Sequence, residues 1–141
     1  MTTRDLLIAM ILTTGIAGCS GDTDAQRVQP YSGISEGETV RFAGNEPFWS
    51  GEVTGNSLIY ATPDNPTGIT VSVNSFAGNG GLSFSGQFAG EDFDLAITPG
   101  ECEDTMADRT YPFTATLSFG TETRYGCAWT DRQPYRGDPR S

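Results

Sequence analysis

Apolar and polar residues alternate along most of the chain between residues 39 and 130. The alternation is clearest in Leu82–Phe88, in Tyr111–Phe119 and in Ile69–Val73. A period of two places successive side chains on opposite faces of a β-strand. Glycine, proline, asparagine and aspartate gather in short turn sequences between these stretches. The pattern therefore predicts strands near residues 39–43, 47–53, 57–62, 69–76, 82–88, 92–98, 110–119 and 123–130.

About eight short antiparallel strands, each with one polar face, must close or stack to hide their edges. We therefore expect an all-β fold, a small antiparallel up-and-down barrel, with a two-sheet sandwich as the alternative. An eight-stranded barrel is just wide enough for side chains to fill it, and aromatic residues are available for this: Phe84, Phe88, Phe93, Phe113 and Phe119. Pro112 falls on an outward position, which predicts a strand edge or a β-bulge there.

A short apolar run, Leu6–Leu12, precedes the sequence Ile16-Ala17-Gly18-Cys19. An aliphatic residue and two small residues before a cysteine are typical of a bacterial lipobox, where a signal peptide is cleaved and the cysteine is lipidated. The apolar run is shorter than the roughly 20 residues that cross a bilayer. The sequence predicts lipidation of Cys19, and a conventional signal peptide cleaved just before it is the alternative.

The residue after Cys19 is Ser20, not the aspartate that favours retention in the inner membrane, so we expect the outer membrane, facing the periplasm. The segment up to about Glu36 is polar and lacks a hydrophobic period, which predicts a flexible tether. The expected organisation is a lipoprotein signal peptide over 1–18, the lipidated cysteine and tether over 19–36, a β-barrel domain over 37–131, and a disordered tail over 132–141.

The chain is strongly acidic. It has 18 Asp and Glu, 8 Lys and Arg, and no His, which gives a formal net charge of -10. A surface of this charge repels phosphate backbones, so nucleic-acid binding is not expected. It also repels anionic bilayers, which leaves the lipid as the attachment to the membrane. A cationic protein, by contrast, would be attracted and steered toward it.

Three cysteines are present, and lipidation accounts for Cys19. Cys102 and Cys127 then remain as a possible disulfide, which an oxidising compartment permits. Two free, buried thiols are the alternative. A metal site is not expected, because two thiolates without a histidine leave the coordination of a soft metal incomplete.

Residues 99–108 are the longest irregular stretch and hold the densest cluster of charges. They are expected to form a loop with at most one helical turn, capped by Asp104 or Thr105. The candidate binding residues are Glu101, Glu103, Asp104, Asp108 and Arg109. Carboxylates could bind calcium, but their spacing fits no calcium-loop template, so no metal is expected. Arg109 is expected to pair with Asp104 or Asp108, and an exposed pair contributes under about 1 kcal/mol.

The sequence offers few side chains that could catalyse a reaction. The chain has neither a histidine to act as general base nor a lysine to activate a serine. A two-carboxylate glycosidase mechanism remains open, but no pair of carboxylates stands out. The glycines fall in hairpin turns, not between a strand and a helix, so no phosphate cradle is present in the sequence. We expect no enzymatic activity, no catalytic residues and no cofactor.

Two aromatic groups are further candidates for binding or for the core. Phe48 and Trp49 are adjacent, so in a strand they face opposite sides. One ring is expected inside, and the other outside, where it could anchor a partner, or capping the open end of the barrel. Trp129, Tyr125 and Cys127 share one face and are expected in the core around the disulfide.

An ordered series of motifs covers most of residues 40–128: Gly44-Asn45-Glu46-Pro47-Phe48-Trp49, then Tyr60-Ala61-Thr62-Pro63-Asp64-Asn65-Pro66, then Cys102 with Met106-Ala107-Asp108-Arg109-Thr110-Tyr111-Pro112-Phe113, and Gly126-Cys127-Ala128. Together they resemble a family of small, uncharacterised bacterial membrane-associated proteins and lipoproteins, sometimes found near heat-shock HslJ-like (META) domains. Ala107 and Thr105 depart from the family pattern, which has serine and glycine there. The resemblance implies an envelope location and paired cysteines, and it implies no enzymatic activity.

Three functions fit these observations. The first is a non-enzymatic cell-envelope lipoprotein with a structural or binding role. The second is a lysozyme inhibitor, in which the acidic loop enters the cleft of a cationic enzyme; membrane-bound inhibitors of c-type lysozyme are similar in size, charge and placement. The third is a carrier of a small apolar ligand, which requires a void inside the barrel. The oligomeric state is not predicted.

Overall fold

The computed structural model describes residues 29–104 and 106–137. The expected signal peptide (1–18), the lipidation site Cys19 and the end of the expected tail (138–141) lie outside the described residues. The described part is built from nine β-strands: β1 (Val40–Asn45), β2 (Phe48–Thr54), β3 (Ser57–Thr62), β4 (Asn65–Ala77), β5 (Leu82–Phe88), β6 (Glu91–Asp104), β7 (Arg109–Phe119), β8 (Glu122–Thr130) and β9 (Arg136–Gly137).

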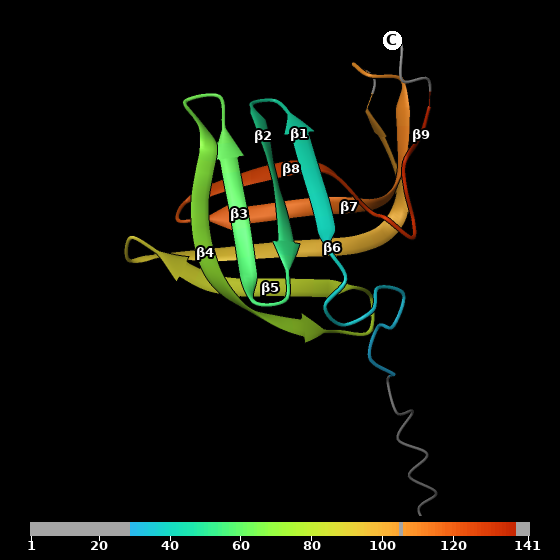
Figure 1. The fold of residues 1–141 in the computed structure, drawn as a ribbon, viewed down its shortest axis with the longest axis horizontal. Helices are drawn as coiled ribbons and strands as arrows, with labels where there is room; N and C mark the ends of the chain where they lie inside the picture. Colours follow the sequence, from blue (N-terminus) through green and yellow to red (C-terminus); the bar gives the residue numbers. More distant parts are fainter. Residues whose placement is uncertain (1–28, 105, 138–141) are drawn as a thin grey trace, which may run out of the picture.

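The first eight strands form a closed antiparallel barrel, which confirms the expected fold. Each strand pairs with the next one along the chain, and β8 returns to pair with β1. The register of this closing pair runs from Val40 opposite Thr130 to Ala43 opposite Cys127. Strands β1–β4 stand upright in Figure 1, and β5–β8 cross behind them at a steep angle. Closure removes the open edges that the sandwich alternative would leave.

Two strands are longer than the sequence predicts by several residues. β4 begins at Asn65, and β6 continues through Asp104 where a loop was expected. Figure 1 shows β4 curving out of the upright layer into the crossing one, and β6 bending upward at its far end. A small barrel with steeply crossing layers needs such strands, because the chain turns a corner without leaving the ladder. The alternation of apolar and polar residues indicates which face of the sheet a residue occupies, but it does not predict where a strand bends.

Side chains of the strands fill the interior of the barrel. The largest fully buried ones are Phe42, Phe93, Phe113, Leu58, Leu95, Ile97, Leu117, Val40, Val53, Val71 and Thr130. Trp49 is 2% exposed and Phe48 is 53% exposed, so the expected division of these adjacent rings is confirmed. The Trp49 ring lies 5.5 Å from the Phe42 ring and 6.3 Å from the Tyr60 ring, between centroids.

The segment before β1 corrects the expected tether. Ile34 is buried in the core, and the Tyr31 amide donates a hydrogen bond of 2.6 Å to the carbonyl of Gly78. Residues 29–36 thus pack across the end of the barrel formed by the β2–β3 and β4–β5 turns. The expected tether was wrong for these residues, because the two side chains that pack against the core, Tyr31 and Ile34, are too few to show a period.

The segment after β8 corrects the expected tail. Strand β9 pairs with β7, with Arg109 opposite Gly137. The Tyr135 ring contacts the rings of Tyr111 and Trp129, with centroids 5.2 and 5.6 Å apart. Residues 132–137 were therefore wrongly expected to be disordered. Aromatic contacts on the outer face of the barrel hold them, and local composition does not report such contacts.

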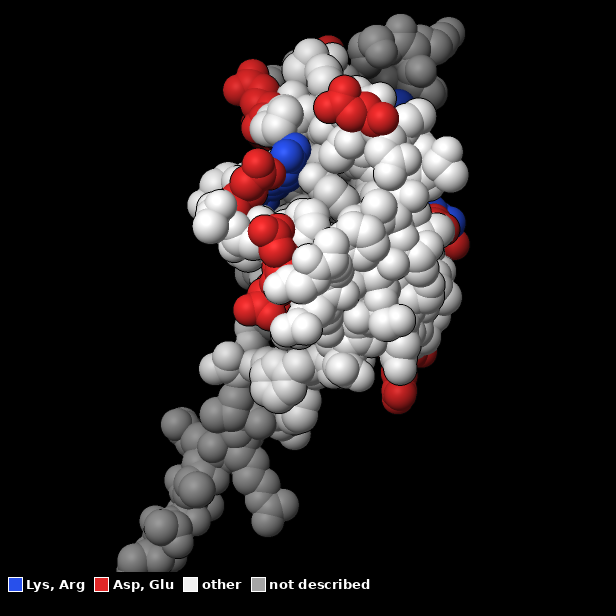
Figure 2. Space-filling model, turned by 90° about the vertical axis from the view of Figure 1, so that its left-hand side faces the viewer, with Lys and Arg blue, Asp and Glu red and all other residues white. Residues whose placement is uncertain are grey.

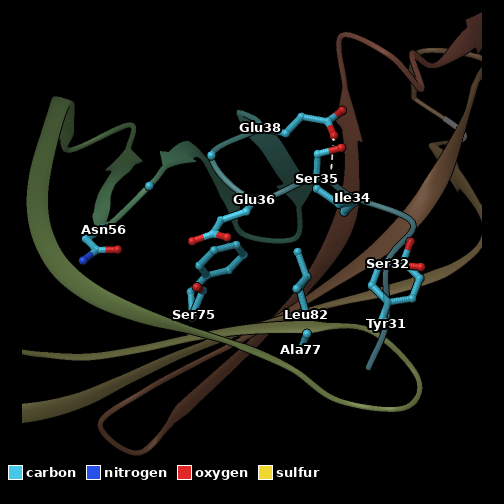
Figure 3. A pocket seen from close by; sticks show the side chains of 13 residues that line it. Tyr31, Ser32, Ile34, Ser35, Glu36, Glu38, Asn56, Ser75, Ala77 and Leu82 are labelled. Atoms are coloured by element: carbon cyan, nitrogen blue, oxygen red, sulfur yellow. Dashed lines mark hydrogen bonds between the residues drawn. The ribbon is translucent and has the colours of Figure 1, made fainter. Parts of the chain in front are cut away.

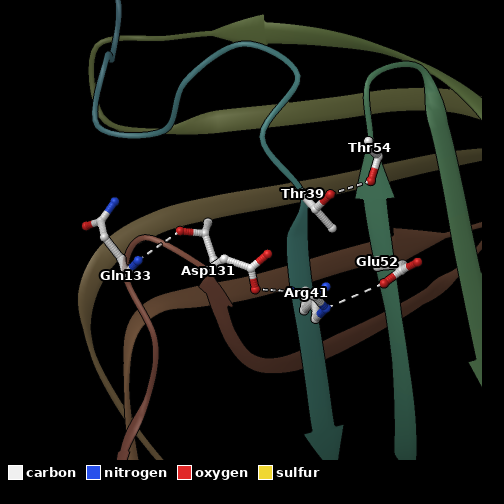
Figure 4. Close-up of polar contacts among 7 residues, drawn as sticks. Thr39, Arg41, Glu52, Thr54, Asp131 and Gln133 are labelled. Atoms are coloured by element: carbon white, nitrogen blue, oxygen red, sulfur yellow. Dashed lines mark hydrogen bonds and ion pairs between the residues drawn. The ribbon is translucent and has the colours of Figure 1, made fainter.

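Polar side chains on the outer surface link β1 to β2 on one side and to the residue after β8 on the other. The Arg41 guanidinium on β1 lies 2.7 Å from Asp131 and 3.5 Å from Glu52, and the hydroxyls of Thr39 and Thr54 are 2.7 Å apart (Figure 4). These groups are largely exposed, so each pair contributes under about 1 kcal/mol. Within the described ranges, no helix is long and apolar enough to cross a membrane.

Candidate functional site

The candidate binding residues lie on the hairpin that joins β6 to β7, and we call Glu101–Arg109 the acidic hairpin. The ladder between the two strands is regular up to Pro99 opposite Phe113 and resumes with Cys102 opposite Tyr111. The bulge between these pairs lies across from Pro112, where the sequence predicts a bulge or edge. The bulge bends the hairpin away from the rest of β6, as Figure 1 shows at the upper right.

A disulfide fixes the acidic hairpin to the barrel. Cys102 on β6 is bonded to Cys127 on β8, with Cα atoms 5.6 Å apart, so the expected pairing is confirmed. The bond reaches over β7, which lies between the two strands in the sheet. It covers Cys127 on the outer face of the barrel, and that residue is buried for this reason.

A second attachment comes from the end of β1. The Asn45 side-chain amide donates a hydrogen bond of 2.6 Å to an Asp104 carboxylate oxygen, and the same oxygen accepts a bond of 3.0 Å from the Met106 amide. Asp104 therefore both closes the turn of the hairpin and binds the hairpin to β1. This partly buried carboxylate has a structural role that the sequence did not reveal, because its partner is 59 residues away.

The remaining charges of the hairpin divide into paired and unpaired groups. Glu101 forms an ion pair of 3.0 Å with Arg136 on β9. The exposed carboxylates of Glu103 and Asp108 form no ion pair with any described residue. These two carboxylates are therefore available to an external cation.

Arg109 does not form the expected ion pair. Its guanidinium carbon lies 4.4 Å from the centre of the Tyr135 ring, a cation–π contact. A hydrogen bond with the Tyr111 side chain raises the pKa of Arg109, so the group keeps its positive charge. The prediction of a pair with Asp104 or Asp108 was wrong because the C-terminal segment, expected to be disordered, supplies a competing partner.

Two hollows flank the end of β1 beside the hairpin. The larger, about 540 Å³, is lined in part by Asn45, Glu46, Glu103, Met106 and Tyr125. The smaller, about 310 Å³, is lined in part by Phe48, Pro63 and Pro66. Both are open on the outer surface, and both include Ala43–Asn45 in their walls.

Tyr125 was expected in the core and is instead 71% exposed. It does share the outer face of β8 with Cys127 and Trp129, as the spacing predicts. The alternation alone does not say whether another element covers that face. Cys127 is covered by the end of β6, whereas Tyr125 lies beyond it.

The opposite end of the barrel holds a third hollow of about 560 Å³, shown in Figure 3. The segment before β1 supplies Tyr31, Ile34 and Glu36, and the ends of β4 and β5 supply Ala77 and Leu82. In Figure 3, Ile34 and Glu36 lie above Leu82 and Ala77, and Tyr31 lies to their right. The hollow lies at the mouth of the barrel, and the strand side chains that fill the interior lie behind it.

Glu38 helps to hold this N-terminal segment in place. Its carboxylate accepts a hydrogen bond of 2.9 Å from the Ser35 amide and lies 3.8 Å from the Arg132 guanidinium. The Thr130 hydroxyl, the Ser35 amide and the charge of Arg132 hold the pKa of Glu38 below its ordinary value. The carboxylate is therefore ionised at neutral pH and is expected to act as a structural anchor.

Acidic residues are not confined to the hairpin. Figure 2, which views the side on the left of Figure 1, shows carboxylates gathered along one border of the molecule with a basic group in their midst. This side carries the β5–β6 and β7–β8 turns, and the Glu122 carboxylate there lies 2.8 Å from the Arg124 guanidinium. Among the described residues, no three Asp, Glu, Cys or His side chains gather closely enough to hold a metal ion.

Comparisons with known proteins add no assignment. No protein-family model, no curated protein and no solved structure matches this chain.

Proposed function

We propose that this protein is a non-enzymatic lipoprotein of the bacterial cell envelope, anchored through Cys19, that binds a cationic protein with its acidic hairpin. The observation that carries the proposal is that this hairpin is held rigidly against the barrel. The Cys102–Cys127 disulfide, the bond from Asn45 to Asp104 and the pairing with β9 hold it, while the carboxylates of Glu103 and Asp108 stay unpaired. A rigid site loses little conformational entropy when it binds.

The geometry of the barrel suits a lipid-anchored protein. The described chain enters at the lower end in Figure 1, and the β1–β2 turn and the acidic hairpin lie at the upper end. Residues 19–28 span at most about 35 Å when fully extended. A lipid on Cys19 would therefore keep the domain near the bilayer, and the acidic hairpin lies at the end of the barrel farther from this attachment (Figure 1). The outer membrane, facing the periplasm, remains the proposed location.

The charge of the chain supports a cationic partner. The net charge of -10 attracts a basic protein over a Debye length of about 10 Å at moderate salt. Complementary charges mainly raise the association rate, and desolvated contacts determine how long the complex lasts. The motif resemblance to uncharacterised membrane-associated proteins and lipoproteins supports the envelope location, and it supplies no catalytic residue.

Inhibition of a c-type lysozyme is the second candidate. The unpaired carboxylates of Glu103 and Asp108 favour it. The disulfide and the Asn45–Asp104 hydrogen bond hold their hairpin in one position, so the carboxylates stay exposed to the cationic cleft of the enzyme. The proposed carrier function is less well supported. Side chains fill the interior of the barrel, and the hollow of about 560 Å³ lies at its mouth.

The test uses the chain from residue 19 with Cys19→Ser, which blocks lipidation. Binding to two basic proteins, a c-type lysozyme and cytochrome c, is measured by calorimetry at low and high salt, together with lysozyme turnover. We expect the Glu103→Gln, Asp108→Asn double variant to weaken binding at low salt about tenfold. The matched control neutralises two exposed carboxylates elsewhere, Glu91→Gln and Asp94→Asn.

The control decides whether the hairpin is the site. An equal loss in the control pair would show that only the overall charge matters and would contradict the proposal, as would a lack of binding to both proteins. Binding that depends on the hairpin but leaves lysozyme turnover unchanged would support the general proposal and remove the inhibitor candidate. Mass spectrometry of the natural protein tests the anchor, and an unmodified amino terminus would contradict it.

A further inference from the structure

Three of the five large apolar side chains that are exposed among the described residues lie at one place. Phe48, Met106 and Tyr125 are 53%, 65% and 71% exposed, and we call them the apolar platform. The other two, Ile59 and Phe76, lie on β3 and β4. Single exposed apolar residues are ordinary, whereas a group of them at one site indicates an interaction surface.

The ladder brings two of the platform residues into one row. Asn45 pairs with Phe48 across the β1–β2 turn. The β1–β8 register ends with Ala43 opposite Cys127, and its continuation places Asn45 beside Tyr125. Neighbouring strands are about 4.8 Å apart, so Phe48 and Tyr125 flank Asn45 at a separation of about 10 Å. Both residues project from the outer face, since Trp49 and Phe42 fill the inner one.

The acidic hairpin brings the third residue to the same place. Asn45, in the middle of the row, binds Asp104, and the Asp104 carboxylate binds the Met106 amide. Met106 and Tyr125 line the same hollow of about 540 Å³. The platform therefore joins residues from β2, β8 and the β6–β7 turn around one side chain of β1.

The platform rests on a rigid support. The Trp49 indole donates a hydrogen bond of 3.3 Å to the carbonyl of Tyr125, which couples β2 to β8 beneath the surface. Any side chain at Gly44 would collide with the Trp49 ring, so β1 and this ring fit closely. Aromatic and methionine side chains held in this way are typical of the residues that dominate binding energy in protein interfaces.

Carboxylates border the platform. Glu46 and Glu103 are exposed and line the same hollow as Met106 and Tyr125. No arginine is among the described residues that line either hollow beside β1. A complementary surface must therefore offer positive charge around an apolar group. We propose that a cationic protein inserts an aliphatic or aromatic side chain between Phe48 and Tyr125 and sets arginine or lysine against Glu46 and Glu103.

This inference rests on the proposed function and defines the surface and partner of the same site. The chemistry disfavours two other occupants. A second copy would bring Glu46 and Glu103 against their own counterparts, and like charges in an interface are costly. A bilayer is disfavoured because the platform lies at the end of the barrel opposite to the one where the described chain begins (Figure 1).

The test compares two double variants of the Cys19→Ser chain that begins at residue 19. Phe48→Ser with Tyr125→Ser removes two of the three platform side chains, and Ile59→Ser with Phe76→Ser removes the two exposed apolar side chains elsewhere, which are 37% and 69% exposed. The probes are a c-type lysozyme and cytochrome c, and binding kinetics are recorded at low and high salt. We expect the platform variant to bind at least one probe about 30-fold more weakly, chiefly through faster dissociation, and the control variant to bind like the parent.

A third variant, Glu46→Gln with Glu103→Gln, is expected to slow association and to reduce its salt dependence. Circular dichroism and thermal unfolding check that each variant is folded. If the platform variant binds like the parent while the Glu103→Gln, Asp108→Asn variant binds poorly, this inference fails and the proposed function stands. If neither probe binds the parent, both fail. Sedimentation that shows a dimer lost only in the platform variant would identify a second copy as the occupant and overturn the inference.

Discussion

Removal of the disulfide should destabilise the barrel by an amount that its loop length determines. Cys102 and Cys127 are 25 residues apart in the sequence. In the chain-entropy account, closing a loop of this length stabilises the native state by about 3.5 kcal/mol at 25 °C, through the entropy of the unfolded chain. The Cys102→Ala, Cys127→Ala variant should lose this amount of unfolding free energy. For a domain of this size, the loss corresponds to a fall in Tm of roughly 15 °C.

Urea unfolding followed by tryptophan fluorescence measures this loss. Trp49 is 2% exposed in the core, so its emission shifts when the barrel opens. The parent chain in reductant is the matched sample, because it breaks the same bond and retains both cysteines. The variant and the reduced parent should show the same loss, since the effect comes from the opened loop and not from the substituted side chains.

Two results would contradict this reasoning. A loss below about 1 kcal/mol would show that the loop entropy is offset elsewhere. A large loss in the variant, together with a small one in the reduced parent, would assign the effect to side-chain packing around Cys127. Amide exchange distinguishes the effect of the disulfide on the hairpin from its effect on global stability. Without the disulfide, the backbone amides of 101–104 should exchange faster by local opening, while the exchange rates in the centre of β2 and β3 should change only with global stability.

Three further predictions concern the core, the hairpin and the pH dependence. Phe93→Ala removes a fully buried ring and should cost about 3–5 kcal/mol in denaturant unfolding; a cost under 1 kcal/mol would contradict a filled interior. Asn45→Ala removes the donor on β1 and leaves the Asp104 carboxylate with only the Met106 amide, so it should cost about 1 kcal/mol, with faster amide exchange in the hairpin, whereas unchanged exchange would argue against the attachment. The pKa of Glu38 lies below its ordinary value of 4.5, chiefly through Thr130, so its stabilisation is present above that value and is lost as the pH falls through the lowered pKa. Unfolding followed from pH 6 to pH 3 should therefore depend less on pH in Glu38→Gln, and identical pH curves would refute this role.

The strands could be predicted because their signal is local. In Ser57–Thr62 and Leu82–Phe88, the sequence range and the observed strand coincide. Each has turn residues on both sides, and Leu82–Phe88 also alternates between apolar and polar residues. The closed barrel was also predictable, since consecutive strands with one polar face leave few other ways to hide their edges.

The sequence shows where the acidic hairpin lies in the chain but does not predict its strand pairing. Its charges identify it as a surface element, yet the sequence predicts a loop where β6 and β7 continue to pair. The bulge after Pro99 is the reason. It changes the direction of the strand without changing its partner, and the polar residues beyond it no longer alternate with buried ones, because the barrel interior has ended.

The two terminal segments were mispredicted for a related reason. Ile34 and Tyr135 each provide one anchoring side chain within polar surroundings. Ile34 has one such neighbour, Tyr31, three residues earlier, and Tyr135 has none at strand or helix spacing, so neither segment shows a repeated period. Tyr135 contacts Trp129 on β8 and Tyr111 on β7, and Ile34 packs into the core of the barrel; such contacts become visible only in three dimensions.

Any binding by this protein must involve its exterior or its ends, because its own side chains fill the interior. The two ends are built differently. One end is covered by the segment that leads to the proposed anchor. The buried side chain of Ile34 and the hydrogen bond from Ser35 to Glu38 fix this segment to the barrel. At the other end, the chain is longer than closure of the barrel requires. The extension of β6 and β7 beyond Pro99 and strand β9 add little to the core, yet a disulfide, a cross-strand amide and an aromatic stack hold them in place. Ordering a segment that the core does not need costs conformational entropy. A role of this segment as a rigid recognition surface would explain why it is nevertheless held in place.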